Sequence, residues 1–387
     1  MSSPRALLVS NGAGEDAIAA EVARRVGGVS LDALPLVGHG VAYEGVARRV
    51  GPQQAMPSGG LVPEALVNLF RDLAGGLAGL VFRQVAFLRR HRRDYGVTVA
   101  VGDLWPVVVA ALGGMRPLLF IGTAKSDYHH PYSALEALVL RTFRVRSLVR
   151  DEPTASHLRE RGVDASWVGN AMMDGLEPTG AELGVGPGEV CLALLPGSRE
   201  GTYQALPRML EAYTRLAGMP GTPPRALVGL SPSVDLERLG GSCPGWEMVP
   251  TGRERGAVAE LRGPAPPVLL VRRAFADVLH RSTLAFGLAG TAHEQAAGLG
   301  RPVVAFEPGG ESRLGWYRGR QKGLLGEALR VVEDDPGLVA AELRRLLEDS
   351  DERERLGRVG RERLGPPGGA GAMARILEEM ARGSAGS

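Results

Sequence analysis

Cysteine is one of the residues that this sequence has least of, and Cys191 and Cys243 do not have the spacing of metal ligands. The sequence therefore predicts a protein without a disulfide framework and without a bound metal. Lysine is equally scarce, because only Lys125 and Lys322 occur and arginine supplies the rest of the 45 basic residues. The formal net charge is +2, which is too small to indicate a nucleic-acid partner.

Long hydrophobic runs are also missing. No stretch reaches the roughly 18 apolar residues that a membrane-spanning helix needs. The first ten residues lack the long apolar core of a secretory signal peptide. We therefore expect a cytoplasmic protein whose membrane contact, if it has any, is peripheral on the inner face of the cytoplasmic membrane.

Short apolar strands alternate with helices along most of the chain, which is typical of α/β proteins. The chain has 387 residues, so two domains are expected rather than one. A stretch at 178–188 is rich in proline and glycine and favours a boundary nearby. We predict a first domain at 1–170, a second at 171–365, and a C-terminal helix with a disordered tail at 366–387.

One glycine loop in the second half follows the strand predicted at 190–195. It contains Gly197, Ser198 and Arg199, and a helix is predicted to begin near Thr202. Glycine lets a ligand approach the backbone, serine donates from its hydroxyl, and the arginine guanidinium matches phosphate oxygens. The pattern favours a phosphate-binding loop.

A second loop of this kind lies about a hundred residues later. Gly290 precedes Thr291, which we expect to cap the next helix, and Glu294 stands at the spacing of a capping box, followed by Gln295. Gly300 is predicted to end this helix. Helix N-termini attract anions, so two such loops on parallel strands of one domain predict a nucleoside diphosphate site.

Polar residues also follow strands in the first half. Asn11 and Gly12 come after the strand at 6–10, ahead of a helix predicted from about Asp16, and Asp103 follows the strand that begins at 97. Open α/β sheets place their chemistry at the carboxyl ends of strands. However, Asp103 is equally suited to cap the following helix, and the loop at 11–16 could be a plain tight turn.

The strand predicted at 118–122 ends in a loop with more polar groups than a turn requires. Lys125 and Asp127 are candidates for contact with a substrate, and Tyr128 follows with two adjacent histidines. The segment 61–95 has apolar residues at helical spacing and an arginine-rich end. It predicts either core helices with a solvated basic end or a surface that contacts acidic lipid.

Three segments together resemble the lipid-A-disaccharide synthase family, and in particular its related branch. They are LLPGSRE (194–200), WVGNAMMD (167–174) and GTAHEQAAGLGRPVVAF (290–306). The resemblance implies an α/β protein of the GT-B fold, with two Rossmann-like domains facing across a cleft. It implies an inverting glycosyltransferase that moves a sugar, an N-acetylglucosamine derivative, from a UDP-sugar to a lipid acceptor without a metal or other cofactor.

The resemblance also assigns roles to residues. Gly197, Ser198, Arg199, Gly290 and Thr291 would hold the donor diphosphate, and Glu294 or Gln295 would contact the nucleoside. Asp103 would be the catalytic base, Asp16 would belong to the catalytic set, and the acceptor side would include Asn11, Gly12, Lys125 and Asp127.

The family's first-loop motif, G-E-x-S-G-D, is altered in this chain. Asp16 matches its last position, whereas Gly12 stands where the motif has glutamate. Two alternatives therefore stay open. The first is a UDP-sugar 2-epimerase, which shares the two-domain fold and a similar donor loop. The second is a non-catalytic UDP-binding protein on a decayed transferase fold.

Overall fold

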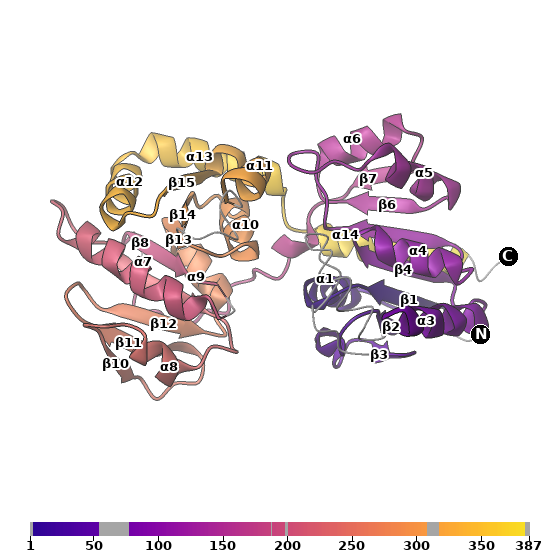
Figure 1. Cartoon of the computed structure of the whole chain (residues 1–387), viewed down its shortest axis with the longest axis horizontal. Helices are drawn as coiled ribbons and strands as arrows, with labels where there is room; N and C mark the ends of the chain where they lie inside the picture. The colour runs from indigo at the N-terminus through magenta and orange to yellow at the C-terminus, as the bar shows by residue number, and fades with distance from the viewer. Residues whose placement is uncertain (1–2, 54–76, 187, 198–199, 308–316, 384–387) are drawn as a thin grey trace. The chain divides into compact units, whose positions relative to one another are not determined.

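The computed structural model describes residues 3–53, 77–186, 188–197, 200–307 and 317–383. The chain forms two compact units (Figure 1). The first comprises Met1–Asp174 and Pro367–Ser387, and the second comprises Gly175–Pro366. The chain therefore ends in the unit in which it begins.

The first unit is built on a seven-stranded sheet with the order β3-β2-β1-β4-β5-β6-β7. Every pair of neighbouring strands in it is parallel. The strands are β1 (Arg5–Ser10), β2 (Ser30–Pro35), β3 (Arg48–Arg49), β4 (Val97–Gly102), β5 (Leu118–Gly122), β6 (Arg146–Val149) and β7 (Ala165–Trp167).

Helices cover both faces of this sheet, as its apolar residues on both faces require. One face packs on α3, α4, α5 and α6, and the other on α1 and α14. Their bounds are α1 (Ala13–Ala23), α3 (Leu77–His91), α4 (Leu104–Leu112), α5 (Ala134–Thr142), α6 (Glu152–Glu160) and α14 (Gly369–Gly383), with short turns η1 (Val41–Tyr43) and η2 (Ala171–Met173). In α3, Leu80 and Leu88 are buried. The part of the predicted helical segment at 61–76 lies outside the described residues.

The second unit is built on an eight-stranded sheet with the order β10-β11-β12-β9-β8-β13-β14-β15. The pairs β10–β11 and β11–β12 are antiparallel and the other pairs are parallel. The strands are β8 (Cys191–Leu195), β9 (Arg225–Leu230), β10 (Glu247–Pro250), β11 (Gly256–Arg262), β12 (Val268–Arg272), β13 (Leu284–Gly287), β14 (Val303–Glu307) and β15 (Leu329–Glu333).

The helices of the second unit pack on this sheet, with α7 and α12 in contact with each other. Their bounds are α7 (Thr202–Ala217), α8 (Leu236–Gly241), α9 (Phe275–Arg281), α10 (Thr291–Gly298), α11 (Lys322–Leu325), α12 (Pro336–Glu348) and α13 (Ser350–Leu364), with η3 (Tyr317–Gln321) and η4 (Gly326–Ala328). The sequence at 351–380 predicts one continuous helix, and this prediction is wrong. The helix ends before Gly365, which has φ +77°, and Pro366 and Pro367 prevent it from continuing.

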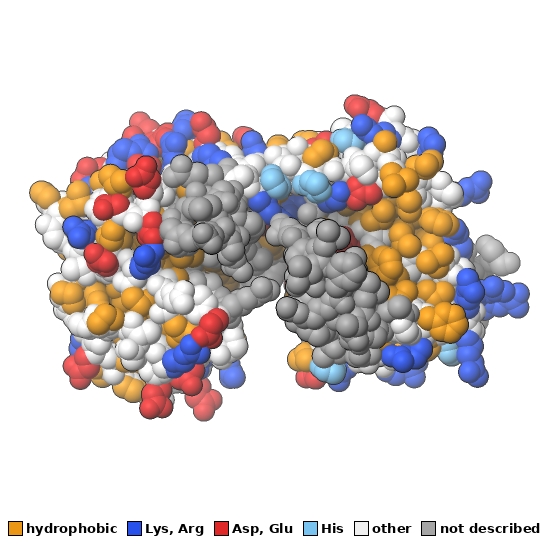
Figure 2. All heavy atoms as spheres, viewed as in Figure 1, with side chains coloured by type: hydrophobic (Ala, Val, Ile, Leu, Met, Phe, Trp, Pro, Cys, Tyr) orange, Lys and Arg blue, Asp and Glu red, His pale blue; other side chains and the backbone are white. Residues whose placement is uncertain are grey.

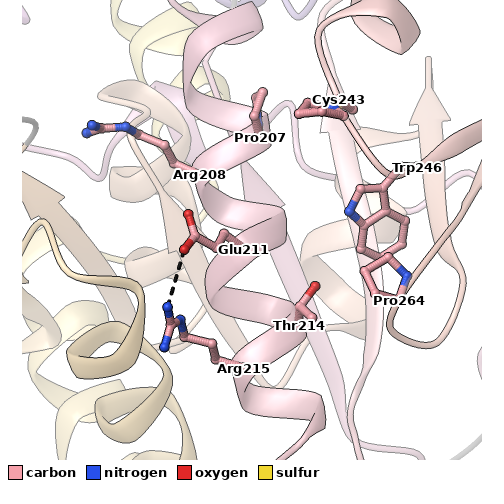
Figure 3. Close-up of a pocket in the computed structure, with 9 residues that line it drawn as sticks. Pro207, Arg208, Glu211, Thr214, Arg215, Cys243, Trp246 and Pro264 are labelled. Carbon is pink, nitrogen blue, oxygen red and sulfur yellow. Dashed lines mark hydrogen bonds and ion pairs between the residues drawn. The ribbon is translucent and has the colours of Figure 1, made fainter.

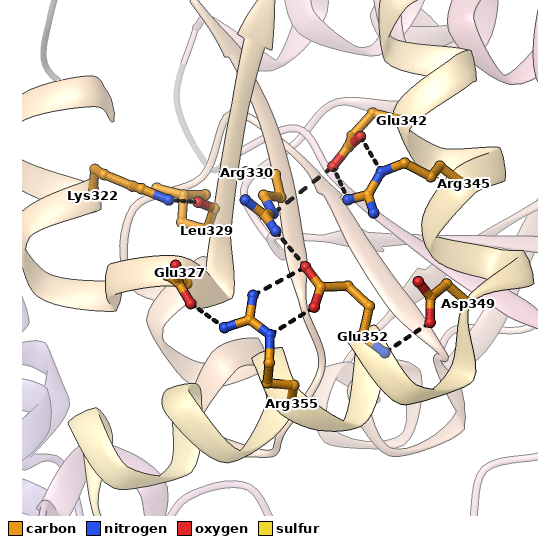
Figure 4. A network of polar contacts seen from close by, with 9 residues as sticks. All are labelled: Lys322, Glu327, Leu329, Arg330, Glu342, Arg345, Asp349, Glu352 and Arg355. Atoms are coloured by element: carbon orange, nitrogen blue, oxygen red, sulfur yellow. Dashed lines mark hydrogen bonds and ion pairs between the residues drawn. The ribbon is translucent and has the colours of Figure 1, made fainter.

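A network of ion pairs ties β15 to α12 and α13 (Figure 4). Arg355 donates to Glu352 over 2.7 Å and also pairs with Glu327, while Arg330 pairs with Glu352 and Glu342. Hydrogen bonds from Arg355 and Arg330 lower the pKa of Glu352 to about 2. The network therefore holds α12 and α13 against the edge strand β15 of the second sheet.

Candidate functional site

The strand order reverses once in the parallel part of each sheet, between β1 and β4 and between β8 and β13. Ligands of open α/β sheets bind at the carboxyl ends of the strands at this switch point. Gly197 and Gly290 follow β8 and β13, whereas Asn11 and Asp103 follow β1 and β4. The sequence-predicted loops therefore meet in pairs, one pair in each unit.

In the second unit, the ends of β8 and β13 are level and in close contact. Gly287 pairs with Leu195 in the parallel register, and the N–H of Leu288 donates to the Leu195 carbonyl over 3.0 Å. A Cβ at Gly287 would lie 2.2 Å from that carbonyl oxygen, and Gly287 has φ +154°. Only glycine fits here, and it brings the two loops side by side.

The first of these loops begins with Pro196 and Gly197, which has φ +100°. Ser198 and Arg199 lie outside the described residues. The loop's far end is fixed by Glu200, which accepts from Arg238 over 3.0 Å. Gly201 then precedes α7, and the side chain of Thr202 is buried at the helix start. The N-terminus of α7 therefore opens at the carboxyl edge of β8.

The second loop differs from its prediction at the helix start. Gly290 is the N-cap of α10 and Thr291 is the first helical residue, so no capping box forms. Thr291 is exposed, which leaves its hydroxyl at the surface of the loop. Glu294 is buried and accepts a hydrogen bond from Gln321 over 3.1 Å, while Gln295 is half-exposed. Gly300 follows the helix with φ +75°, and its predicted role as the helix stop is confirmed.

His293, which the sequence did not single out, is fully buried in the first turn of α10. Burial lowers its pKa to about 3, so the imidazole is neutral at physiological pH. No local sequence pattern indicates that this side chain is buried.

In the first unit, Asp103 caps α4. Its carboxylate accepts from the N–H of Trp105 over 2.9 Å and from the side chain of Asn11. Burial raises the pKa of Asp103, although both hydrogen bonds act in the opposite direction. The capping interpretation is thus confirmed, and the raised pKa is also suited to a proton acceptor at this strand end.

Glu15 lies against Asp103, a proximity that the sequence did not indicate. A Cβ on Gly102 would lie 2.7 Å from the Cγ of Glu15, so the glycine makes room for this side chain. Burial raises the pKa of Glu15, and the neighbouring charges of Asp103 and Asp16 raise it further. Two carboxyl groups therefore lie near each other at this switch point.

Asp16 has a different environment. The helix predicted from about Asp16 begins at Ala13, because Gly12 with φ +146° already forms its N-cap. Asp16 is therefore buried in the first turn of α1, where it accepts from Ser10 over 2.5 Å, and Ser10 bonds to Tyr43 over 2.6 Å. Burial raises the pKa of Asp16 to about 6. This geometry makes Asp16 a residue that positions the loop.

The loop after β5 holds its charged residues in pairs. Lys125 donates to Glu136 over 2.7 Å, and Asp127 pairs with His157 over 2.6 Å. Burial acts to raise the pKa of Glu136, but the hydrogen bonds from Lys125 and Ser133 lower it overall. Of the two acceptor-side residues predicted in this loop, Lys125 pairs with Glu136, whose charge acts on Asp103, and Asp127 is part of the contact with α6.

An exposed apolar band crosses the helices on one face of the first unit (Figure 2). We define it by Phe82 of α3, Leu112 of α4, and Leu135 and Leu138 of α5, which are 46–76% exposed. Arg89, Arg90, Arg92 and Arg93 are exposed at the end of α3 and just beyond it. The side chain of Arg89 donates to the Leu112 carbonyl over 3.1 Å, so the arginines border the band.

A shallow pocket of about 500 Å³ lies elsewhere, along α7 in the second unit (Figure 3). Trp246 and Cys243 face Pro207 and Thr214 of α7 across it, and Arg208 is also among the residues that line it. Its charged groups are paired, Arg208 with Asp334 and Arg215 with Glu211. The α7 residues that line it begin at Pro207, so the lining does not include the first turn of α7 or the glycine loops of the second unit.

The described ranges contain no cluster of three or more histidine, cysteine, aspartate or glutamate side chains placed to hold a metal ion. No helix within them has the length and apolar character needed to span a bilayer.

Comparison of the sequence with protein-family models and with curated proteins gives no match. Solved structures do match over nearly the whole chain. MurG from Acinetobacter baumannii has a TM-score of 0.60 at 13% identity, covering 97% of this chain and 99% of its own. A UDP-GlcNAc 2-epimerase from Neisseria meningitidis, bound to UDP-GlcNAc, has a TM-score of 0.58 at 13% identity. The match covers 98% of this chain and 100% of the epimerase chain.

The glycosyltransferase SnogD from Streptomyces nogalater is also similar, with a TM-score of 0.50 at 17% identity and coverage of 98% and 100%. At these identities the likeness establishes the fold and leaves the reaction open. Together with the two Rossmann-like sheets, it confirms the predicted α/β class: the chain has the two-domain GT-B fold.

Proposed function

We propose that the protein is an inverting glycosyltransferase that transfers a sugar of the N-acetylglucosamine class from a UDP-sugar to a lipid acceptor at a membrane surface. In this it would resemble lipid-A-disaccharide synthase. The observation that carries the proposal is the apolar band beside a carboxylate site. Leu135 is next to Glu136 at the start of α5, and the half-exposed Leu104 and Trp105 directly follow Asp103. An amphipathic acceptor could rest its tail on the band while its head group reaches Asp103.

The donor would bind at the switch point of the second unit. The glycines at 197 and 290 allow a diphosphate to approach the N-termini of α7 and α10, where the helix dipoles favour negative charge. Thr291 would add a hydroxyl donor, and the sequence adds Ser198 and Arg199. Gln295 suits the nucleoside contact better than Glu294, because Glu294 is buried and bonded to Gln321.

The reaction would be a single displacement. Asp103, with Glu15 beside it, takes the proton of an acceptor hydroxyl as that oxygen forms a bond to the anomeric carbon. The bond from this carbon to the UDP oxygen breaks, and its electron pair leaves with UDP. The N-terminal N–H groups of α7 and α10 stabilise the charge that develops on the leaving group.

To test this, the protein is incubated with radiolabelled UDP-GlcNAc and lipid vesicles, and the label is measured in the extracted lipid and in the aqueous phase. Label in the extracted lipid supports the transferase. Asp103→Asn should lower transfer by about 10²–10⁴-fold and still bind UDP, because asparagine also caps a helix and only the base is lost. Asp94→Asn is the matched control, since Asp94 is exposed and bonds to His91 away from the strand ends.

A UDP-sugar 2-epimerase is the second candidate, favoured by the similarity of the Neisseria meningitidis epimerase over the whole chain. An epimerase acts on a single soluble substrate and has no use for the apolar band. Conversion of UDP-GlcNAc to its 2-epimer in the aqueous phase, without label in lipid, would replace the transferase with this function. UDP binding without either product would indicate the non-catalytic alternative.

A further inference from the structure

Carboxylates dominate the switch-point edge of the first unit. Lys125 and Arg150 lie there among carboxyl groups that include Glu15, Asp16, Asp103, Glu136 and Asp151. Lys125 forms an ion pair with Glu136 over 2.7 Å, and Arg150 donates to the Thr123 carbonyl over 3.2 Å. The N-terminus of α1 opens at the same edge, but Glu15 and Asp16 already place negative charge in its first turn.

Besides the carboxylate oxygens Oδ1 of Asp127 and Oδ2 of Asp151, two buried polar atoms at this edge have no hydrogen-bond partner among the described residues. One is Oδ1 of Asn11, whose side chain is 6% exposed and whose amide donates to Asp103. The other is the hydroxyl of Tyr132, which is 2% exposed. It lies at the end of β5, 2.6 Å from where a Cβ on Gly122 would be.

Unpartnered buried groups of this kind are costly, and a ligand that bonds to them recovers the loss. The amide oxygen of Asn11 can only accept a hydrogen bond, and ionised carboxylates also only accept. The Tyr132 hydroxyl can donate or accept. The ligand that fits this set must therefore bring its own donors.

We propose that this edge binds an uncharged, hydroxyl-rich group, such as the sugar or polyol head of a neutral glycolipid, and that it discriminates against phosphorylated head groups. Sugar hydroxyls donate to Asn11 Oδ1 and to the carboxylates, and accept from Tyr132. A phosphate has no proton to donate at neutral pH and would be repelled by the carboxylates. The inference rests on the proposed function, because it names the chemical class of the acceptor.

The test compares octyl β-D-glucopyranoside with its 6-phosphate, both below their micelle concentrations. Dissociation constants are measured for the full-length protein by ligand-observed NMR at pH 7 and low salt. We expect the neutral glycoside to bind at least about tenfold more tightly than the phosphate, with the difference shrinking as salt is added. Equal affinities, tighter binding of the phosphate, or no binding of the neutral glycoside would overturn the proposal.

Two variants locate the effect. Asn11→Ala should weaken binding of the neutral glycoside by about tenfold, because it removes the buried acceptor. Glu15→Gln should lower the preference for the neutral probe at least about threefold, because it removes one charge. Glu160→Gln is the matched control, since it makes the same charge change at the far end of α6, and it should leave the preference unaltered. An unaltered preference in Glu15→Gln, or unaltered affinity in Asn11→Ala, would place the binding elsewhere.

A thermal-shift titration of the same protein with UDP separates the two proposals. If UDP gives no shift, the proposed function fails whatever the glycosides do. If UDP binds and the phosphorylated glycoside is preferred, the proposed function stands and the inference about the acceptor fails.

Discussion

A Cβ on Gly287 would lie 2.2 Å from the carbonyl oxygen of Leu195, well inside any real contact between those atoms. The two residues end the neighbouring strands β13 and β8, and the two glycine loops begin just beyond them. The close approach of these strand ends therefore decides where the two loops stand.

Gly287→Ala should destabilise the second unit by at least about 1–3 kcal/mol, since the new Cβ must push the strand ends apart and the residue has a positive φ. We expect UDP binding to weaken as well, because the two loops would separate. Urea denaturation and a UDP titration measure the two effects. The control is Gly241→Ala at the end of α8, where a Cβ meets nothing within 4 Å. An alanine at 287 with native stability would contradict the close contact.

Phe82→Asp should weaken binding to anionic vesicles about tenfold or more. The phenyl ring is 76% exposed, and inserting an aromatic side chain of this size into lipid is worth about 1.5–3 kcal/mol. Vesicle flotation at several salt concentrations measures this, and added salt should weaken binding because arginines border the band. Val190→Asp makes the same kind of change at an exposed residue of the second unit. If both variants bind alike, the apolar band is not the lipid-binding surface.

Asp16→Asn should change how stability depends on pH. The native pKa of about 6 lies above the ordinary value of 3.8, so the native state holds a proton that the unfolded state releases first. The stability from this group is therefore present below pH 4 and is lost as pH rises through 6, by about 1–3 kcal/mol. The asparagine variant should lack this loss between pH 4.5 and pH 8 in urea denaturation. Asp94→Asn serves as the exposed control and should follow the wild type.

His293→Gln tests the opposite dependence of stability on pH, because folding lowers the pKa of this histidine. The native pKa of about 3 lies below the ordinary value of 6.5, so only the unfolded state gains a proton as pH falls below 6.5. The wild type should lose about 2 kcal/mol of unfolding free energy between pH 7.5 and pH 5 from this group. The variant should lose less, whereas His39→Gln, at an exposed position, should behave like the wild type. Equal losses in all three proteins would show that the imidazole is not buried neutral.

The sequence predicts the central strands well. It predicts strands at 118–122 and at 225–230, which coincide with β5 and β9, because a short apolar run that is almost entirely buried leaves little choice of structure. The pair β10 and β11 was missed, since it lies in the segment 218–268 where proline and glycine interrupt the pattern. Partly exposed edge strands carry a weaker periodic signal than buried ones.

The sequence predicts only those features of the candidate sites that depend on neighbouring residues in the chain. Glycines after strands and an acidic residue before α4 are visible in the sequence, and the strand order then brings them together. The proximity of Glu15 to Asp103 depends on β1 lying next to β4, which no local pattern in the sequence indicates. Helices α1 and α10 begin earlier than the sequence predicts, at Ala13 and Thr291. The reason is that Gly12 and Gly290, rather than residues with a polar side chain, occupy the N-cap positions.

The last helix has a consequence for how the protein is made. Met373 and Leu377 of α14 are buried in the same cluster as Ala6 and Leu8 of β1, and Asp174 accepts from the backbone at the start of the helix. A ribosome thus completes the first unit's sheet early but supplies α14, which covers part of one face of that sheet, only after the whole second unit has been translated. Until then α1 covers only part of that apolar face, so premature termination shortly before residue 369 should produce an aggregating chain, although every strand of both sheets has already been synthesised.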